Sequence, residues 1–151
     1  MGKIDDAIAR MAGHLVYLDT NVFVYFLGRS PDYFPVVAPI IEAIESGVII
    51  GHTGDAAIAE TLVKPYQTDN LALVASFKAF FSTENFLSIQ THGAETFDLA
   101  AQLRAHRGLK FIDALHYATA IQSGCKFMVT NDNGIQSSNV LEVISIKTLV
   151  E

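Results

Sequence analysis

The sequence is poor in cysteine, in basic residues and in long hydrophobic runs. One cysteine, Cys125, leaves no partner for an internal disulfide, as is typical of a reducing compartment. Pro35, Pro39 and scattered charges interrupt every apolar stretch before it reaches the roughly 18 residues of a membrane span. Asp5 and Asp6 stand where a secretory signal needs uninterrupted apolar residues. We therefore expect a cytoplasmic protein without a membrane segment.

Basic residues are outnumbered, with ten Lys and Arg against sixteen Asp and Glu and a net charge of −6. This balance disfavours a protein that binds nucleic acid tightly through phosphate contacts, because such binding needs a basic face. It does not exclude an enzyme that acts on nucleic acid, since bound divalent cations reverse the local sign of an acidic pocket. The chain also lacks a His/Cys set at zinc spacing and a glycine-rich phosphate loop.

What the sequence has is apolar residues, which make up 50% of the chain and predict a substantial core. No repeat, low-complexity tract or linker divides it. Ile4, Ala7, Ile8 and Met11 have helical spacing, so we expect residues 1–13 to be an N-terminal extension or short helix. Residues 14–151 are then expected to form one domain.

Short apolar runs alternate with longer amphipathic segments along the chain. Strands are expected at residues 15–18, 48–50, 86–89, 126–130 and 141–146, the last at a sheet edge. Helices are expected at residues 21–27, 36–45, 56–63, 71–81, 94–106 and 112–122, the third ending before Pro65. This alternation predicts an α/β fold with a mainly parallel sheet covered by helices on both faces.

Two acidic residues follow predicted buried strands. Asp19 ends the run Leu15–Leu18, and Asp132 follows the run that ends at Thr130. The carboxyl ends of parallel strands are where open α/β sheets bind their ligands. Each acid also has an ordinary interpretation, Asp19 as a helix N-cap and Asp132 as part of an Asx turn.

Two further acids lie on predicted helices that are unusually apolar. Glu60 has small apolar neighbours, and Asp113 follows Phe111 and Ile112 at a helix start. Their ordinary interpretations are a surface pair of Glu60 with Lys64 and a favourable charge at the helix dipole for Asp113. Four converging carboxylates would repel one another unless a cation lay between them. Oxygen ligands alone favour Mg²⁺ or Mn²⁺.

These segments resemble the PIN-domain family, in particular the toxin nucleases of VapBC-type toxin–antitoxin pairs. The resemblance covers residues 15–146, and its motifs are Asp19-Thr20-Asn21, Glu60 with Leu62-Val63-Lys64-Pro65, the helix Asp113–Ala120, and Thr130-Asn131-Asp132. It implies a three-layer α/β/α, Rossmann-like PIN domain. Gly54 departs from the pattern, because members often carry a serine about six residues before the glutamate. A small polar contact is therefore expected to be missing.

The resemblance implies a Mg²⁺- or Mn²⁺-dependent endoribonuclease that cleaves RNA phosphodiester bonds. Asp19 and Asp113 are then expected to bind the metal directly, and Glu60 and Asp132 to complete the site directly or through water. A cognate antitoxin and a homodimer are also implied. Thr20, Asn21, Thr130 and Asn131 are plausible donors to the carboxylates or the phosphate, although turn and cap roles explain them almost as well.

Other residues have weaker functional interpretations. Flanking phosphates could be held by basic side chains that are more often simply solvated, namely Arg29, Lys64, Arg104, Arg107 and Lys110. A structural role is favoured for His116, and a core position for Cys125. Packing is favoured over RNA stacking for Phe77, Phe80, Phe81 and Phe86.

Two alternatives to a ribonuclease stay open. One is phosphoryl transfer on an acidic pocket, as in haloacid-dehalogenase-type phosphatases, although Asn21 stands where those enzymes need a second aspartate. The other is a degenerate, non-enzymatic interaction domain in which the acids only cap helices and turns.

Overall fold

The computed structural model describes residues 2–151 and has five strands and seven α-helices, followed by one 3₁₀ turn. The strands are β1 (Leu15–Leu18), β2 (Ile50–Gly54), β3 (Ser88–Gln90), β4 (Phe127–Thr130) and β5 (Glu142–Ser145). The helices are α1 (Lys3–Met11), α2 (Thr20–Leu27), α3 (Phe34–Glu45), α4 (Ala56–Gln67), α5 (Leu71–Phe81), α6 (Ala94–Arg107), α7 (Phe111–Gln122) and the 3₁₀ turn η1 (Ile146–Leu149).

The five strands form one parallel sheet in the order β3-β2-β1-β4-β5. β1 lies in the middle, and the chain moves outward from it in one direction to β2 and β3 and later in the other to β4 and β5. This reversal makes the carboxyl ends of β1 and β4 the topological switch point, where open α/β sheets bind ligands. Leu18 lies opposite Val129 there, so the segments that follow both strands emerge side by side.

Side chains of the central strands alternate between two cores. Val16 and Leu18 of β1 pack in one core, with α1, α2 and α3, while Tyr17 between them packs in the other, with α6 and α7. β4 repeats the pattern, since Met128 points to the α6–α7 side. Both faces are therefore buried, as period-two alternation in a covered parallel strand requires. The sequence prediction of a three-layer α/β/α fold is confirmed.

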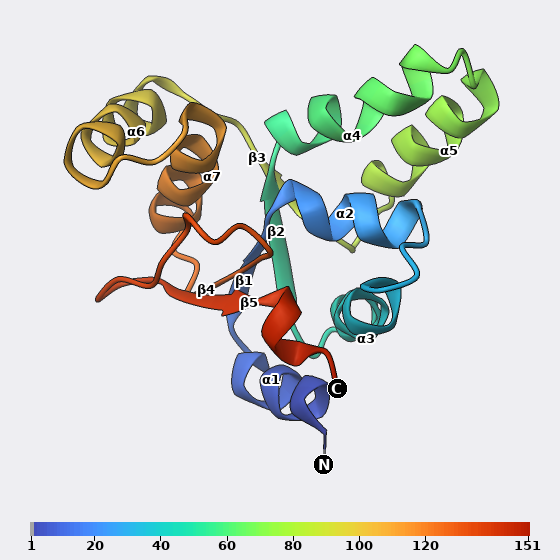
Figure 1. Cartoon of the computed structure of the whole chain (residues 1–151), viewed down its shortest axis with the longest axis horizontal. Coiled ribbons are helices and arrows are strands. Elements are labelled where there is room, and N and C mark those ends of the chain that lie inside the picture. The colour runs from blue at the N-terminus through green and yellow to red at the C-terminus, as the bar shows by residue number, and fades with distance from the viewer. Residues whose placement is uncertain (1) are drawn as a thin grey trace.

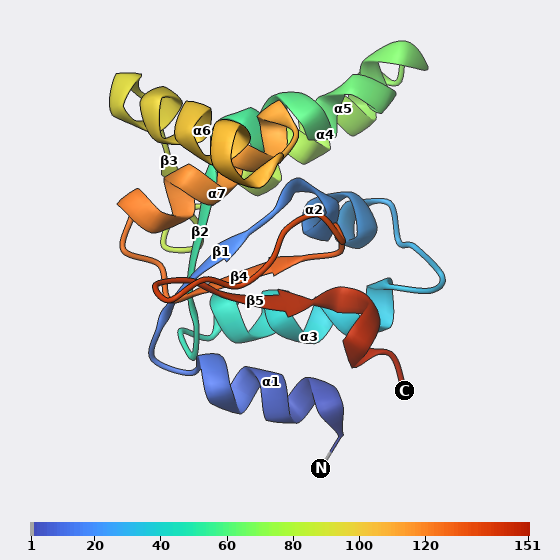
Figure 2. The ribbon, with the colours of Figure 1, turned by 60° about the vertical axis from the view of Figure 1, so that its left-hand side comes forward.

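The figures show how the helices cover the sheet. In Figure 2, α1 and α3 lie below the sheet and α6 and α7 lie above it. Figure 1 shows α4 and α5 as an antiparallel arm that extends beyond α2. The arm has its own small cluster of buried side chains, Leu62, Val74 and Phe77. Within the arm, α4 carries Glu60 to the carboxyl end of β1, where Glu60 and Asp19 line the same pocket.

β2 is the element that the sequence placed incorrectly. The expected strand at residues 48–50 followed apolar residues, but the structure has Val48 in the turn after α3 and β2 at Ile50–Gly54. After Ile50, β2 consists of glycines and the polar residues His52 and Thr53, whose side chains form hydrogen bonds within the protein. Thr53 Oγ1 donates to the carbonyl of Leu18 at 2.8 Å, and His52 Nδ1 lies 3.1 Å from Gln90 Nε2. Hydrophobic periodicity alone does not detect a strand of this kind.

Two helix boundaries also differ from the expectation. α4 does not end before Pro65 but continues to Gln67, because Pro65 lies in its last turn and removes only one intrahelical hydrogen bond. α3 begins at Phe34, with Pro35 in its first turn, where its missing N–H has no intrahelical partner to lose. The expected end of α4 was wrong because Pro65 was read as a barrier rather than as a residue tolerated near a helix end.

Cys125 is buried, and its burial raises the pKa of the thiol to about 12, which leaves it protonated and unreactive. Phe77 and Phe81 are buried and Phe80 and Phe86 pack edge-on, as expected for packing residues. Between residues 2 and 151, no helix is long and apolar enough to cross a membrane.

Candidate metal centre

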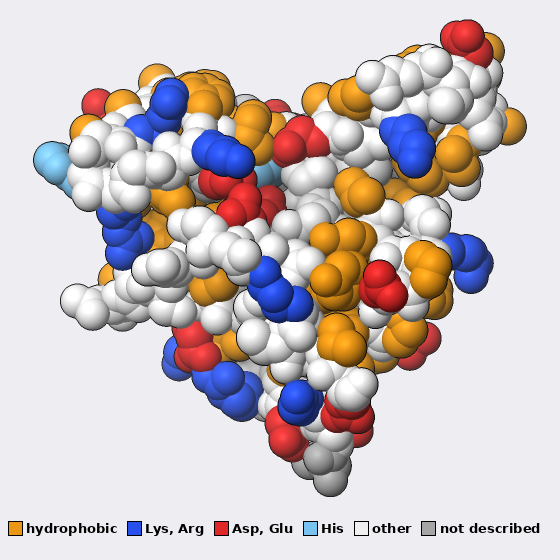
Figure 3. Space-filling model, in the orientation of Figure 1, with side chains coloured by type: hydrophobic (Ala, Val, Ile, Leu, Met, Phe, Trp, Pro, Cys, Tyr) orange, Lys and Arg blue, Asp and Glu red, His pale blue; other side chains and the backbone are white. Residues whose placement is uncertain are grey.

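The four acids picked out in the sequence line one pocket at the carboxyl ends of the strands. Its volume is about 390 Å³, and its walls come from α2, α4, the start of α7 and the loop after β4. We call the side chains of Asp19, Glu60, Asp113 and Asp132 the acidic cup. Figure 3 shows acidic side chains gathered at the centre of this face, between α7 and α4. The remaining lining residues are Thr20, Asn21, Val24, Tyr25 and Ile112.

Asp19 is placed by the end of β1 and the start of α2. It has extended backbone at the N-cap of α2, and its Oδ1 accepts from the Thr20 N–H at 2.8 Å. Its Oδ2 accepts from the Thr130 hydroxyl at 2.7 Å. Burial raises the pKa of Asp19, which is only 5% exposed, although these hydrogen bonds partly offset the effect. The cap and a place in the cup are thus one arrangement rather than alternatives.

Glu60 projects from α4 and does not form the expected pair with Lys64. Its Oε1 instead accepts from the Thr20 hydroxyl at 2.6 Å and from His116 Nε2 at 2.8 Å. Burial alone would raise the pKa of Glu60, but the hydrogen bonds from His116 and Thr20 hold that pKa below its usual value. Glu60 is therefore an anchored carboxylate anion.

His116 is the residue whose contact with the cup the sequence did not predict. Its ring is fully buried, and Nδ1 lies 2.6 Å from the Tyr17 hydroxyl. Burial raises the pKa of Tyr17, so its hydroxyl stays protonated and donates to Nδ1. Nε2 then carries the proton donated to Glu60. The only sequence signal was that His116 lies one helical turn after Asp113, on the same face of α7.

His92 packs against His116 and fills the space beside Gly54. The two imidazole rings lie 5.5 Å apart, and His92 Nδ1 is 2.6 Å from the Thr119 hydroxyl. A Cβ atom added at Gly54 would lie 2.3 Å from the His92 ring and 2.6 Å from the Tyr17 oxygen. Gly54 thus does not leave a gap where the resemblance expects serine. The imidazole and the phenol occupy that volume.

Asp113 and Asp132 face each other on the other side of the cup. Asp113 is in the first turn of α7, and Asp132 accepts from the Gly134 N–H at 2.8 Å, which closes the expected Asx turn. Burial and the adjacent Asp132 carboxyl raise the pKa of Asp113 to about 7. Two carboxyl groups this close retain a proton near neutral pH unless a cation compensates their charge.

Thr130 links the two sides of the cup. Its hydroxyl donates to Asp19, so its oxygen is left to accept from the Asp132 N–H at 3.1 Å and from Asn21 Nδ2 at 3.4 Å. Asn21 Oδ1, which belongs to a residue lining the cup, is buried and has no hydrogen-bond partner among residues 2–151. Asn131 points elsewhere, since it donates to the Tyr25 hydroxyl at 3.1 Å and accepts from the Lys147 N–H.

The basic side chains considered in the sequence surround the cup without entering it. Arg29, Arg104 and Arg107 each lie over an aromatic ring, at 5.3 to 5.8 Å from its centroid. Lys110 lies close enough to Asp113 to oppose the increase in its pKa. Lys64 lines an adjoining, largely apolar pocket between α2 and the α4–α5 arm, which shares Glu60 with the cup.

The donor set fits a hard divalent cation, because four carboxylates line the cup. Within residues 2–151, no three acidic, histidine or cysteine side chains lie close enough to form a complete coordination shell as they stand. The cup is wider than such a shell. The shared pocket and the close Asp113–Asp132 pair are both features that a bound cation would stabilise.

An open parallel α/β/α fold with an acidic pocket at the switch point defines a class of protein that binds ligands at its strand ends. The chain belongs to the PIN domain family, whose profile matches residues 16–139. Comparison with curated proteins finds no significant match.

Several solved structures share the fold at low sequence identity. A toxin–antitoxin complex from Klebsiella pneumoniae aligns with a TM-score of 0.67 and 16% identity, over 87% of this chain and 97% of that one. VapBC2 from Rickettsia felis, bound to a DNA fragment from its promoter, aligns with a TM-score of 0.63 and 20% identity, over 85% and 98%. VapC20 of Mycobacterium tuberculosis, a toxin that cleaves the sarcin–ricin loop, aligns with a TM-score of 0.62 and 12% identity, over 75% and 86%.

Proposed function

We propose that the protein is a PIN-domain endoribonuclease that uses Mg²⁺ or Mn²⁺ and acts as the toxin of a type II toxin–antitoxin pair. The observation that carries the proposal is that Asp19, Glu60, Asp113 and Asp132, from four separate segments, line one pocket. Membership of the PIN domain family supports a nuclease. The similar folds of VapC20 and of toxin–antitoxin complexes support the narrower assignment.

The four acids have two roles in this proposal. Asp19 and Asp113 bind the cation, and Glu60 and Asp132 complete the site directly or through water. A divalent cation supplies Lewis-acid stabilisation of a phosphodiester oxygen and lowers the pKa of a bound water. The hydrogen bonds from Thr20 and Thr130 keep the carboxylates of Glu60 and Asp19 in fixed orientations. Such fixed charges lose little free energy to reorganisation during the reaction.

Cleavage of a labelled single-stranded RNA in Mg²⁺, in Mn²⁺ and in EDTA tests the catalytic part of the proposal. We expect cleavage with either cation, none in EDTA, and a loss of at least about 100-fold in Asp19→Asn and Asp113→Asn, since each removes a charge at the reacting centre. The matched control is Asp98→Asn, which removes an exposed carboxylate on α6 and should leave the rate unchanged. Cleavage that persists in EDTA, or in both cup variants, would contradict the proposal. Hydrolysis of phosphomonoesters with no RNA cleavage would favour the phosphatase alternative.

The proposed partners are a cognate antitoxin and a second copy of the chain, in the cytoplasm. Support for the antitoxin comes from the solved complexes with similar folds. Co-expression with the adjacent small open reading frame should relieve growth inhibition by the parent protein. Light scattering of the purified chain should give twice the mass of 16.4 kDa. A monomer in solution would contradict the homodimer and leave the catalytic proposal unaffected.

A further inference from the structure

A second pocket lies beside the acidic cup, between the two loops that lead to its facing acids. Its volume is about 250 Å³, and it is lined by Arg107, Leu109, Tyr117, Gly134 and Gln136. The loop that contains Leu109 leads into α7 and Asp113, and the loop that contains Gly134 follows Asp132. Both loops of this pocket therefore adjoin, along the chain, a segment that carries an acid of the cup.

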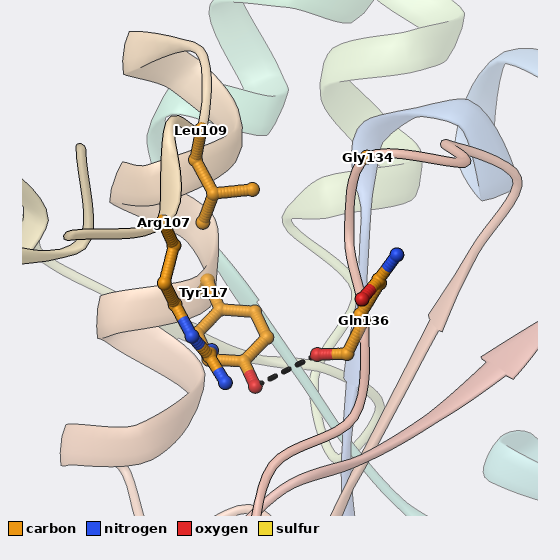
Figure 4. A pocket seen from close by; sticks show the side chains of 5 residues that line it. All are labelled: Arg107, Leu109, Tyr117, Gly134 and Gln136. Carbon is orange, nitrogen blue, oxygen red and sulfur yellow. Dashed lines mark hydrogen bonds between the residues drawn. The ribbon is translucent and has the colours of Figure 1, made fainter.

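The pocket has a fixed aromatic wall and a guanidinium group above it. Figure 4 shows Arg107 beside the Tyr117 ring, with Gln136 on the opposite loop and its backbone carbonyl toward the Tyr117 hydroxyl. The Arg107 guanidinium carbon lies 5.4 Å from the ring centroid. Tyr117 is buried, and its hydroxyl donates to the Gln136 carbonyl at 3.0 Å, which holds the two sides of the pocket together.

The side chains of Arg107 and Gln136 form no hydrogen bond with another part of residues 2–151. Arg107 is exposed and forms no ion pair with any acid of residues 2–151, so its five N–H donors face solvent. The exposed Gln136 side chain adds an amide that can donate and accept. Leu109 and Tyr117 line the pocket from below, although both side chains are largely buried. A planar cation, an amide and an apolar wall together suit a nucleotide, which carries both a phosphate and a nucleobase.

We propose that this pocket binds the nucleotide next to the scissile phosphodiester, with Arg107 pairing its phosphate and the base lying against Leu109 and Gln136. The inference rests on the proposed nuclease function and adds a substrate contact to it. The pocket is below the roughly 300–1,000 Å³ of drug-sized ligand sites, so it accommodates a single nucleotide unit rather than a longer segment. The pocket also supplies a positive charge for RNA binding, which the acidic chain otherwise disfavours. A net charge of −6 repels RNA, and a basic contact beside the cup offsets that repulsion where the strand must lie.

Arg104 provides a matched control. It is an exposed arginine on α6, three residues before Arg107, and lies over an aromatic ring, Phe111, at 5.8 Å. It carries the same charge in a similar stacking contact but does not line the pocket. A diffuse electrostatic contribution to RNA binding would therefore involve Arg104 and Arg107 alike, whereas a built subsite would involve Arg107 alone.

The test measures the binding of a fluorescein-labelled RNA decamer of mixed sequence by anisotropy, in Mg²⁺ and on an Asp113→Asn background that prevents cleavage. We expect Arg107→Gln to raise Kd about tenfold, the effect of one lost charged hydrogen-bond pair. The slope of log Kd against log salt should fall by about 0.7, as for one single-strand phosphate contact. Arg107→Lys, which keeps the charge but not the planar fork, should lose about threefold. Arg104→Gln should change Kd by no more than about twofold, the effect of a screened surface charge.

Two results would overturn the subsite. One is an equal loss in Arg104→Gln and Arg107→Gln, and the other is no loss in Arg107→Gln with the fold intact by circular dichroism. A competition arm distinguishes a nucleotide from a simple anion. Uridine monophosphate should displace the decamer at lower concentration than inorganic phosphate, and equal potency would refute a base-binding pocket. Because binding is measured without cleavage, failure of the nuclease proposal is distinguishable: the parent would then bind through Arg107 but cut no RNA.

Discussion

The Asp19–Glu60 side of the acidic cup and the Asp113–Asp132 side hold their carboxylates differently. Asp19 and Glu60 each accept two hydrogen bonds from the protein. Asp113 and Asp132 face each other, and within the described residues, 2–151, the Gly134 N–H is the one backbone donor bonded to either carboxylate. The first side is oriented by the fold alone. The second side is compensated only when a proton or a cation lies between its acids.

This difference suggests that the two sides of the cup have different roles in binding the cation in the proposed enzyme. The anchored side provides a rigid frame for the cation, as supporting hydrogen bonds do at other metal sites. The facing pair provides the affinity, since its repulsion is relieved on binding. Thr130 connects the two, because one hydroxyl contacts both Asp19 and the Asp132 backbone. Two kinds of substitution test this comparison: those that disturb the hydrogen bonds of the anchored side, and those that remove the repulsion between Asp113 and Asp132.

Removing His116, which holds Glu60 through a hydrogen bond, should have the largest effect on stability. His116→Ala deletes a fully buried ring and leaves the Tyr17 hydroxyl and Glu60 without their partner. We expect the free energy of unfolding to fall by about 2–4 kcal/mol, from a cavity and from unsatisfied buried groups. Urea unfolding followed by circular dichroism measures it. His106→Ala, an exposed histidine on α6, is the control and should change stability by less than about 0.5 kcal/mol. A similar, small loss in both variants would mean that Glu60 is not anchored through His116.

Adding a side chain at Gly54, beside His92 and Tyr17, should have the next largest effect on stability. Gly54→Ser introduces the serine expected from the PIN-domain pattern, but its Cβ would collide with the rigid Tyr17 hydroxyl and the His92 ring. We expect a loss of about 1–3 kcal/mol in the free energy of unfolding, as for overpacking of a core. The double variant Gly54→Ser with His92→Ala should be less destabilised than the sum of the two single changes. A serine tolerated without cost would show that the His92 ring does not depend on this glycine.

The two sides also differ in what the sequence could reveal. Asp19 and Asp132 were detectable because each follows a short buried strand, and Asp113 because it opens an apolar helix. The contact between Glu60 and His116 joins residues 56 positions apart. It depends on how α4 and α7 rotate against the sheet, which no local pattern specifies. The filling of the space at Gly54 by His92 depends on the loop between β3 and α6.

The same limit explains the errors in the fold. The order and type of the helices followed from their apolar spacing, and the parallel sheet followed from the alternation of strands with helices. β2 was misplaced because His52 and Thr53 are polar residues in a buried strand, where hydrogen bonds to Gln90 and Leu18 replace hydrophobic packing. Periodicity detects burial of apolar side chains, and it does not detect polar groups whose partners come from elsewhere in the chain.

Removing the charge of Asp113 should have the smallest effect on stability, and the change should be stabilising rather than destabilising. The pKa of Asp113, about 7 in the folded protein, is higher than the usual value near 3.9. The stability supplied by its proton is therefore complete below pH about 4, declines as pH rises and is lost above pH about 7. In EDTA at pH 7.5, Asp113→Asn should raise the melting temperature by a few degrees, and it should flatten the fall in stability between pH 5 and pH 7.5. Mg²⁺ should raise the melting temperature of the parent at pH 7.5 more than that of Asp113→Asn, with Asp98→Asn behaving as the parent. If the melting temperature of the parent did not respond to Mg²⁺ and Asp113→Asn melted no higher in EDTA, the facing acids would not repel one another, and the distinction between the two sides of the cup would fail.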